Sequence, residues 1–318
     1  MITDPDRRSV LSSVGWVDKD AVWRYDVASG TAGTIPLGSG ASYLSLHAGT
    51  GGRFAVAHHF DGKRFEITVR DFAAPEAVRA RAAIDAGGSA LSGDLAAWAD
   101  VPRLYVAMLG FPPWDDFVLV RPAPDHGRLD VHRLDWYDQG YDKMYQGIVD
   151  VLELPGGETA LVSVQRSSRL IVHDLGTGKA RAHVDLAGRA GNPRLALREG
   201  GSELWADDYD TLVVVRTRDW RVDRKRHMQG ALSGTQQFMG AYAFAPDAAV
   251  CVVARPFSGD VVGVDTRSLK IVSSAKVGGQ PLQVAALPEG RVVARDWKTG
   301  ALLQGRLERH RLARMSWW

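Results

Sequence analysis

The stretch LVSVQRSSRLIVHDLGTGK, residues Leu161–Lys179, consists of two apolar strands joined by a polar loop, and the second strand ends in Asp174 before a glycine-rich turn. Weaker copies of this order occur at Val22–Gly30, Phe65–Glu76 and Asp260–Lys270. Short apolar runs bounded by Gly, Asp and Ser are typical of strands and turns. The chain therefore repeats one strand-based unit, and its period predicts a repeat architecture.

Seven landmarks define the period, each at the end of the third strand-like run of one unit. The intervals between neighbouring landmarks run from 41 to 53 residues, which is the length of a four-stranded propeller blade. The sequence therefore predicts an all-β fold, a seven-bladed β-propeller of four-stranded antiparallel blades that forms a single domain over residues 1–318. The landmarks are Asp26, Asp71, Arg121, Asp174, Arg216, Asp265 and Arg306.

The two ends of the chain bear on how such a propeller would close. The first unit begins at DPDRR (Asp4–Arg8) with almost no inner strand before it, and the tail after Arg306 extends beyond the last third strand. We therefore expect the two termini to close the ring, with one terminus completing a blade begun by the other. Trp317 and Trp318 would then pack at this seam, and the alternative is a tail that does not pack, because termini often fray.

Three segments carry a resemblance to a known group of proteins: Leu161–Lys179, Asn192–Val215 and Leu282–Gly300. They resemble the YVTN-type seven-bladed propellers, a superfamily that is also similar to the propeller subunits of amine dehydrogenases. In that pattern the inner strand runs into a turn of the Pro-Asp-Gly type, and Ala245–Asp247 and Leu287–Gly290 keep such a turn. The signature tetrapeptide itself is absent, so the resemblance implies the fold and no catalytic residues.

Composition narrows the classes of function. The 318 residues include 39 basic and 37 acidic side chains, a formal net charge of +2. Because the two signs are mixed along the chain, neither a nucleic-acid partner nor a membrane partner is expected. The N-terminus lacks an apolar stretch of signal-peptide length, which predicts a cytoplasmic protein. Cys251, the single cysteine, lies in the apolar run VCVVA and is expected in the core.

One face of the predicted propeller collects aromatic and polar residues. The loops from second to third strands and from outer to inner strands would emerge there around the central channel. Rings supply apolar area and polar groups fix orientation, which suits a small molecule, a glycan, a peptide or a protein partner. The alternative is structural, because propellers also use Trp, Tyr and Asp to join neighbouring blades. The ligand-binding candidates are Trp16, Phe60, Trp114, Tyr137, Tyr141, Lys143, Tyr145, Gln165, Tyr209, Phe238, Phe257 and Trp297.

Two segments depart most from the repeat. Asp135–Gly147, DWYDQGYDKMYQG, combines four aromatic and three acidic residues and precedes the inner strand of the fourth unit. Long loops in compact domains are disproportionately functional, so this segment is the first candidate for ligand contact. The alternative is a surface insertion packed over the channel mouth. Pro112–Asp116, PPWDD, is the second candidate because it is rigid and aromatic.

An enzyme is the alternative function. The sequence lacks the Gly-x-Ser-x-Gly, His-Glu-x-x-His and Cys-x-x-Cys signatures and requires no cofactor. A lyase or hydrolase would use a His or Asp base, and possibly a divalent metal, at the same face. No metal site is predicted, because His58 and His59 are neighbours on a strand and point to opposite faces. Electron transfer beside a quinone or haem partner follows only from the amine-dehydrogenase resemblance. The catalytic candidates are His59, Asp115, Arg166, Asp208 and Arg255.

Overall fold

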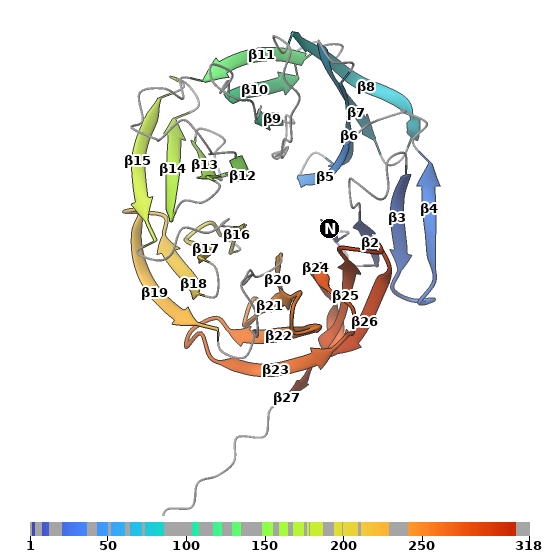
Figure 1. The fold of residues 1–318 in the computed structure, drawn as a ribbon, viewed down its shortest axis with the longest axis vertical. Coiled ribbons are helices and arrows are strands. Elements are labelled where there is room, and N and C mark those ends of the chain that lie inside the picture. The colour runs from blue at the N-terminus through green and yellow to red at the C-terminus, as the bar shows by residue number, and fades with distance from the viewer. Residues whose placement is uncertain are drawn as a thin grey trace, which may run out of the picture. The chain divides into compact units, whose positions relative to one another are not determined.

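The computed structural model is built from β-strands, and its described helical segment is the 3₁₀ turn Pro288–Gly290 (Figure 1). The chain divides into two compact units, Met1–His227 and Met228–Trp318. The backbone is described at residues 2–3, 8–12, 21–36, 43–49, 52–60, 64–71, 74–85, 104–107, 117–122, 129–134, 148–154, 159–164, 168–174, 177, 179–186, 194–198, 200–208, 211–228 and 241–309. Side chains are described at residues 3, 8–12, 21–36, 152, 154, 168–174, 177, 179–186, 194–198, 200–207, 211–228 and 241–308.

The described strands of the first unit form five antiparallel sheets. Four of these sheets have four strands in sequence order, and the sheet of β9, β10 and β11 has three. The strands are β1 (Ile2–Thr3), β2 (Ser9–Ser12), β3 (Ala21–Asp26), β4 (Ala32–Pro36), β5 (Tyr43–Gly49), β6 (Gly52–Phe60), β7 (Arg64–Asp71), β8 (Ala74–Asp85), β9 (Leu104–Ala107), β10 (Phe117–Pro122), β11 (Leu129–Leu134), β12 (Ile148–Glu153), β13 (Thr159–Val164), β14 (Arg169–Asp174), β15 (Ala180–Asp185), β16 (Leu195–Leu197), β17 (Glu203–Asp208), β18 (Thr211–Arg216) and β19 (Arg221–His227).

The described strands of the second unit form two antiparallel sheets, one of order β20-β21-β22-β23-β27 and one of order β24-β25-β26. Apart from β27, the strands of each described sheet are neighbours in chain order, as the repeat predicted, whereas the number of blades stays a prediction. The strands are β20 (Tyr242–Phe244), β21 (Val250–Arg255), β22 (Asp260–Asp265), β23 (Ile271–Lys276), β24 (Pro281–Ala286), β25 (Arg291–Asp296), β26 (Leu302–Arg306) and β27 (Glu308–Arg309).

The amino-acid pattern of each strand matches its position in the sheet. The third strand β18 has the sequence TLVVVR, and its four central residues are buried because neighbouring strands and both sheet faces cover them. β22 is buried in the same way over Asp260–Val264. The outer strand β19 instead alternates exposed and half-buried residues over Arg221–Lys225. Continuous apolar runs therefore mark central strands, and charged alternating runs mark edges.

One turn recurs after β3, β14, β22 and β25, and it explains the Asp at the end of each of these four strands. Asp26 and Asp265 accept bonds through Oδ1 from the N–H and hydroxyl of the serine three residues later, Ser29 and Ser268. The serine hydroxyl in turn accepts the N–H two residues further on. Asp174 with Thr177, and Asp296 with Thr299, make the same contacts. After β18 an ion pair, Arg216 to Asp219, stands at these two positions instead.

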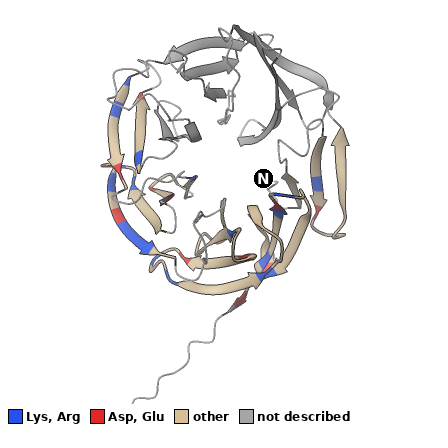
Figure 2. Ribbon diagram, in the orientation of Figure 1, with Lys and Arg blue, Asp and Glu red and all other residues tan. Residues whose placement is uncertain are grey.

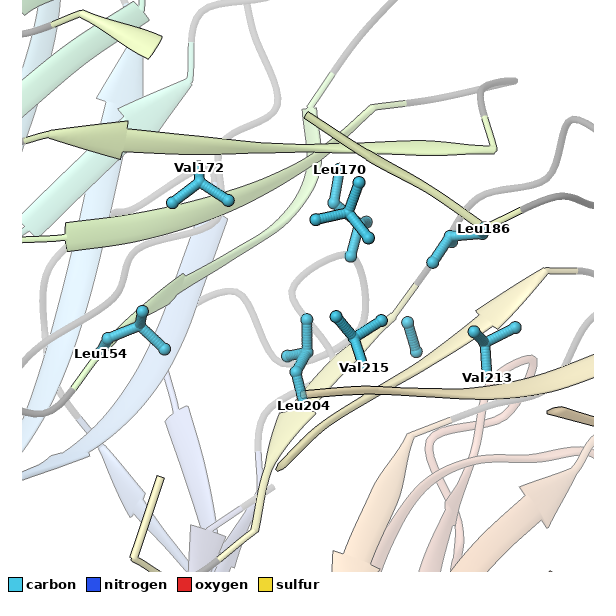
Figure 3. Close-up of a cluster of buried hydrophobic side chains, with 9 residues drawn as sticks. Leu154, Leu170, Val172, Leu186, Leu204, Val213 and Val215 are labelled. Carbon is cyan, nitrogen blue, oxygen red and sulfur yellow. The ribbon is translucent and has the colours of Figure 1, made fainter. Parts of the chain in front are cut away.

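The core of each unit includes apolar side chains packed between two neighbouring sheets. Figure 3 shows Leu170 and Val172 of β14 facing Leu204 of β17 and Val213 and Val215 of β18. All five side chains are removed from solvent, and burying each one stabilises the fold by roughly 1.5–3 kcal/mol. In the second unit a similar cluster lies between the sheets of β20–β23 and β24–β26; its buried members are Val252, Ala254, Val261, Ala275, Val284, Ala286, Val292 and Ala294.

Cys251 lies on β21 and is fully buried, so its predicted place in the core is confirmed. Burial raises the pKa of its thiol well above the usual value, because the apolar surroundings disfavour the thiolate. Among the residues that the structure describes, no helix has the length and apolarity needed to cross a membrane.

The terminal strands that the structure describes pair within separate sheets. β1 pairs with β2 as the first strand of the first sheet, through Ile2–Leu11 and Thr3–Val10. At the other end, β27 leaves the sheet of β26 and pairs with β23 through Ser273–Arg309 and Ser274–Glu308. The described residues therefore contain no sheet shared by the two termini. Ring closure stays a prediction, and the proposed seam of Trp317 and Trp318 lies outside the described residues.

Candidate functional site

Three of the predicted site residues have described side chains, and all three lie in the second unit. Arg255 ends β21, Phe257 lies in the turn between β21 and β22, and Trp297 follows β25. His59 and Phe60 belong to strand β6, where their backbones pair with Glu66 and Phe65, so they end a strand and do not lie in a loop. Asp208 is likewise the last residue of strand β17. The side chains of His59, Phe60 and Asp208 are not described. The remaining candidates lie wholly outside the described residues; they are Trp16, Trp114, Asp115, Tyr137, Tyr141, Lys143, Tyr145, Gln165, Arg166, Tyr209 and Phe238, together with the segments Asp135–Gly147 and Pro112–Asp116.

Arg255 has a structural partner. Its Nε donates to Asp260 Oδ1 at 2.8 Å and its Nη2 donates to Asp260 Oδ2 at 2.6 Å. The two residues are directly opposite each other at the end of the β21–β22 hairpin, and both are buried. A bidentate pair of this kind is strong and geometrically specific. It favours the structural interpretation of Arg255 over its role as a charge-stabilising catalytic residue.

Around this pair, three connections are hydrogen-bonded to one another. The Gly259 carbonyl accepts the N–H groups of Val277 and Gly278, at 3.3 and 3.1 Å. The Gln280 N–H donates to Asp296 Oδ2 at 2.6 Å, and the Gln280 carbonyl accepts the Trp297 N–H at 3.0 Å. The Trp297 Nε1–H also donates to Gln280 Oε1. We call this set the loop network, defined as Phe257–Gly259, Val277–Gln280 and Asp296–Trp297.

Two glycines permit the close approach of these connections. Gly259 has a φ of +62°, and a Cβ there would lie 3.2 Å from the Gly279 carbonyl oxygen. Gly279 has a φ of +55°, and a Cβ there would lie 2.4 Å from Asp296 Oδ2. Both conformations and both approaches are available only without a side chain. The loop network is thus closely packed along its length.

Asp296 is the electrostatic centre of the loop network. Burial of its carboxyl would by itself raise the pKa, but the N–H groups of Gln280 and Thr299, the Thr299 hydroxyl and the Lys298 N–H hold the pKa below its ordinary value. Hydrogen bonds to the ionised form overcome the desolvation that opposes it. A carboxylate held in this way binds neighbouring backbone and is poorly suited to act as a general base.

The first unit contains the same kind of contact between an aspartate and the residue that precedes an inner strand. Asp207, near the end of β17, accepts the N–H of Arg194 through Oδ1 at 2.6 Å, and Arg194 immediately precedes the inner strand β16. Asp207 is 1% exposed. An aspartate at the end of the second strand therefore fixes the chain as it enters the inner strand in both units, which gives Asp207 a structural role.

The loop network exposes an aromatic ring, and two lysines adjoin it in the sequence. Phe257 is 38% exposed, although it adjoins the buried Arg255–Asp260 pair. The Lys276 side chain is 79% exposed; its Nζ donates to the Ser258 carbonyl at 3.2 Å and lies 3.7 Å from Asp260 Oδ2. Trp297 is half-buried and Lys298 is exposed. This part of the predicted face can therefore offer an apolar anchor with positive charge beside it, which is the chemistry of a recognition surface.

Sequence reasoning missed a pocket at the opposite end of the same two sheets. It lies between the turns that precede β21 and β25, Ala245–Asp247 and Leu287–Gly290, and has a volume of about 660 Å³. Antiparallel strands place successive turns at alternate ends of a sheet, so this pocket and the loop network lie at opposite ends of β21 and β25. The Pro-containing turns were visible in the sequence, but only as markers of the repeat.

Cations also gather on the outer strand β19 of the first unit (Figure 2). Arg221, Lys225 and Arg226 are exposed there, whereas Arg224 pairs with Glu203 at 2.6 Å and with Asp223 at 3.0 Å. β19 is the edge of its sheet. Charged side chains on an edge strand oppose pairing with other chains, so this cluster has a structural explanation.

Comparisons with known proteins agree on the fold alone. No protein-family model matches the sequence, and no curated protein matches it. A similar solved structure is the β-propeller domain of Cps50 (Swd1) from Myceliophteria thermophila, with 12% identity, a TM-score of 0.70, and 96% of this chain and 95% of that chain covered. Another is Kuenenia stuttgartiensis hydrazine synthase, with 14% identity, a TM-score of 0.67, and coverage of 96% and 94%. The chain has a β-propeller fold.

Proposed function

We propose that this β-propeller recognises a partner protein through the face that bears the loop network. The exposed ring of Phe257 carries the proposal, because its turn is fixed on both sides. Arg255 and Asp260 join the two ends of that turn, and the Gly259 carbonyl joins it to Val277 and Gly278.

A rigid aromatic side chain is an efficient anchor for binding. Phe257 buries a large apolar area when a partner covers it, and little conformational freedom of its backbone remains to be lost. Lys276 at the end of β23 and Lys298 just after β25 are both exposed. Their positive charges would favour carboxylates on the partner around its apolar contact residue. The expected ligand is therefore a protein segment with an apolar residue flanked by carboxylates.

The other ligand-binding candidates extend this proposal as sequence-based predictions. Trp114 and Tyr141, for example, are expected in loops that reach the same face in other repeats of the sequence. Smaller ligands such as a glycan or a free peptide would use the same aromatic chemistry. The lyase or hydrolase alternative gains no support from Arg255, whose guanidinium is occupied by Asp260.

The test replaces Phe257 with a photo-crosslinking amino acid in the full chain and identifies the captured protein from the source cells. The purified partner is then titrated against wild type, Phe257→Ala and a matched control, Val272→Ala. Val272 is the other exposed large hydrophobic residue in the described part of the chain, at 36% exposure, and lies on β23.

We expect Phe257→Ala to weaken binding by roughly 30-fold, as for an aromatic hot spot, and Val272→Ala to change it less than about twofold. Equal affinities for wild type and Phe257→Ala would overturn the assignment of this surface. Equal crosslinking yields from positions 257 and 272 would do the same.

A further inference from the structure

The pocket at the opposite end of the second unit is a chemically distinct site. It is bounded by the Ala245–Asp247 turn, the Leu287–Gly290 turn, and the chain that follows β26. Its volume of about 660 Å³ is within the range of sites that hold a small molecule or a few residues of a peptide. The proposed partner surface does not include this pocket, and a ligand of the pocket would be independent of that partner.

The floor of the pocket is apolar. Val252, Ala286 and Leu287 are between 1% and 3% exposed, and Val250 and Leu307 line it as half-buried residues. A ligand that places hydrocarbon here removes apolar surface from water on both sides, which favours binding. The pocket therefore selects for a ligand with an aliphatic or aromatic part.

Two arginines stand side by side on one wall. Arg291 begins β25 and Arg306 ends β26, and their Cα atoms are directly opposite in the antiparallel register. Both residues line the pocket. Two guanidinium groups on one wall make that wall positively charged, and guanidinium groups bind anions through charge-assisted hydrogen bonds. This pairing is the feature that points to an anionic ligand.

The acids of the pocket are at its rim. Asp247 is exposed in its turn, where Oδ1 accepts the Ala249 N–H at 3.0 Å. Glu289 is exposed at the tip of the other turn, and it is the Glu289 carbonyl that accepts Arg306 Nε, at 3.3 Å. Among the described residues the structure shows no ion pair of Arg306 with a carboxylate. The Arg306 guanidinium therefore keeps donors for a ligand.

We propose that this pocket binds a carboxylate that carries an apolar group, with the carboxylate at Arg291 and Arg306 and the apolar group over Val252, Ala286 and Leu287. The planar guanidinium fork matches the two oxygens of a carboxylate. Two sources can supply this chemistry, a free apolar carboxylic acid and the C-terminal carboxylate of a peptide with an apolar last residue. Both are tested below.

The experiment titrates the full chain by calorimetry with octanoate, octanol and octylamine, and with an uncharged pentapeptide ending in leucine as its free acid and as its amide. We expect octanoate, the peptide acid or both to bind with a Kd on the order of 100 µM. Octanol, octylamine and the peptide amide should bind at least about tenfold more weakly, because they lack the charge-assisted hydrogen bonds. Binding of octanoate assigns a free acid, and binding of the peptide acid alone assigns a peptide terminus.

The variants locate the site. Arg306→Gln keeps most of the side-chain length and removes the charge, so it should weaken the best ligand at least about tenfold. Arg306→Lys should retain part of the affinity, because it keeps the charge without the fork. Arg221→Gln removes an exposed cation at the start of β19, outside the pocket, and should change affinity less than about twofold. Unfolding midpoints measured alongside confirm that each variant is folded.

Three results would overturn the proposal. The first is equal binding of octanoate and octanol, together with equal binding of the peptide acid and its amide. The second is an Arg306→Gln variant that binds like wild type. The third is no detectable binding of octanoate or of the peptide acid at concentrations up to about 5 mM, which corresponds to a binding free energy weaker than about −3 kcal/mol.

Discussion

Arg255 and Asp260 join the ends of the β21–β22 hairpin through a bidentate ion pair, and both are more than nine-tenths removed from solvent. The pair lies directly below the turn that exposes Phe257. The exposed ring is thus supported by a buried charge pair whose loss would leave an uncompensated charge inside the protein. Structure and proposed recognition are therefore coupled at this hairpin.

The first prediction concerns this pair. Asp260→Asn leaves the Arg255 guanidinium buried without its counter-charge, and we expect the free energy of unfolding to fall by about 3 kcal/mol. The measurement is the urea unfolding curve. Asp219→Asn serves as the control, because Asp219 pairs with Arg216 at the surface, where both side chains are 35% exposed, and it should leave the midpoint unchanged within error. Similar shifts in both variants would show that the buried pair is no stronger than a surface pair.

The second prediction concerns the recurring turn. Thr299 donates to Asp296 Oδ1 from both its N–H and its hydroxyl, at 2.8 and 3.0 Å. Thr299→Ala removes the hydroxyl, so we expect the free energy of unfolding to fall by about 1 kcal/mol. Thr299→Ser keeps the hydroxyl and should stay close to wild type. Thermal and urea unfolding of wild type and the two variants measure this difference. Equal losses of unfolding free energy in Thr299→Ala and Thr299→Ser would assign the effect to the missing methyl group.

The third prediction follows from two carboxyl groups with lowered pKa values. The Ser268 hydroxyl and N–H lower the pKa of Asp265, and the hydrogen bonds described above lower that of Asp296. The pKa of an aspartate in the unfolded chain is about 3.9. A carboxyl whose pKa is lower in the folded protein stabilises the fold above about pH 3.9, and this contribution is lost as the pH falls through the pKa of the folded state. Below about pH 4 the unfolding free energy of wild type should therefore fall more steeply than that of Asp296→Asn. Parallel curves from pH 7 to pH 2 would contradict this linkage.

The sequence predicted the strand order well, because the repeat carries strong local signals. The apolar runs that end in Asp174 and Asp265 became β14 and β22, and their Asp-x-x-Ser/Thr turns formed with the expected Asp at the strand end. The segment Glu76–Ala86 has helical propensity, but its described residues, 76–85, lie in strand β8, Ala74–Asp85. Sheet pairing here outweighs local helical propensity.

The candidate site was harder to predict, because residue type and loop position do not reveal pairing. Arg255 looked like an available cation, but its partner Asp260 is five residues away across a hairpin whose register the sequence does not state. Arg291 and Arg306 were overlooked for the same reason. They are 15 positions apart in the sequence and become neighbours only through the β25–β26 register.

The last prediction uses backbone strain at the pocket rim. Ala248 has a φ of +51° in the turn between β20 and β21, a conformation that costs an L-residue roughly 1 kcal/mol and costs glycine little. Its neighbour Ala249 is not among the described residues with positive φ. Both glycine substitutions destabilise the protein through the greater conformational entropy of the unfolded chain, but only Ala248→Gly also relieves backbone strain. The Ala248→Gly variant should therefore be more stable than the Ala249→Gly variant by about 1 kcal/mol. Urea unfolding of the two variants measures the difference, and an equal loss in both would mean that the Ala248 turn relaxes without strain in solution.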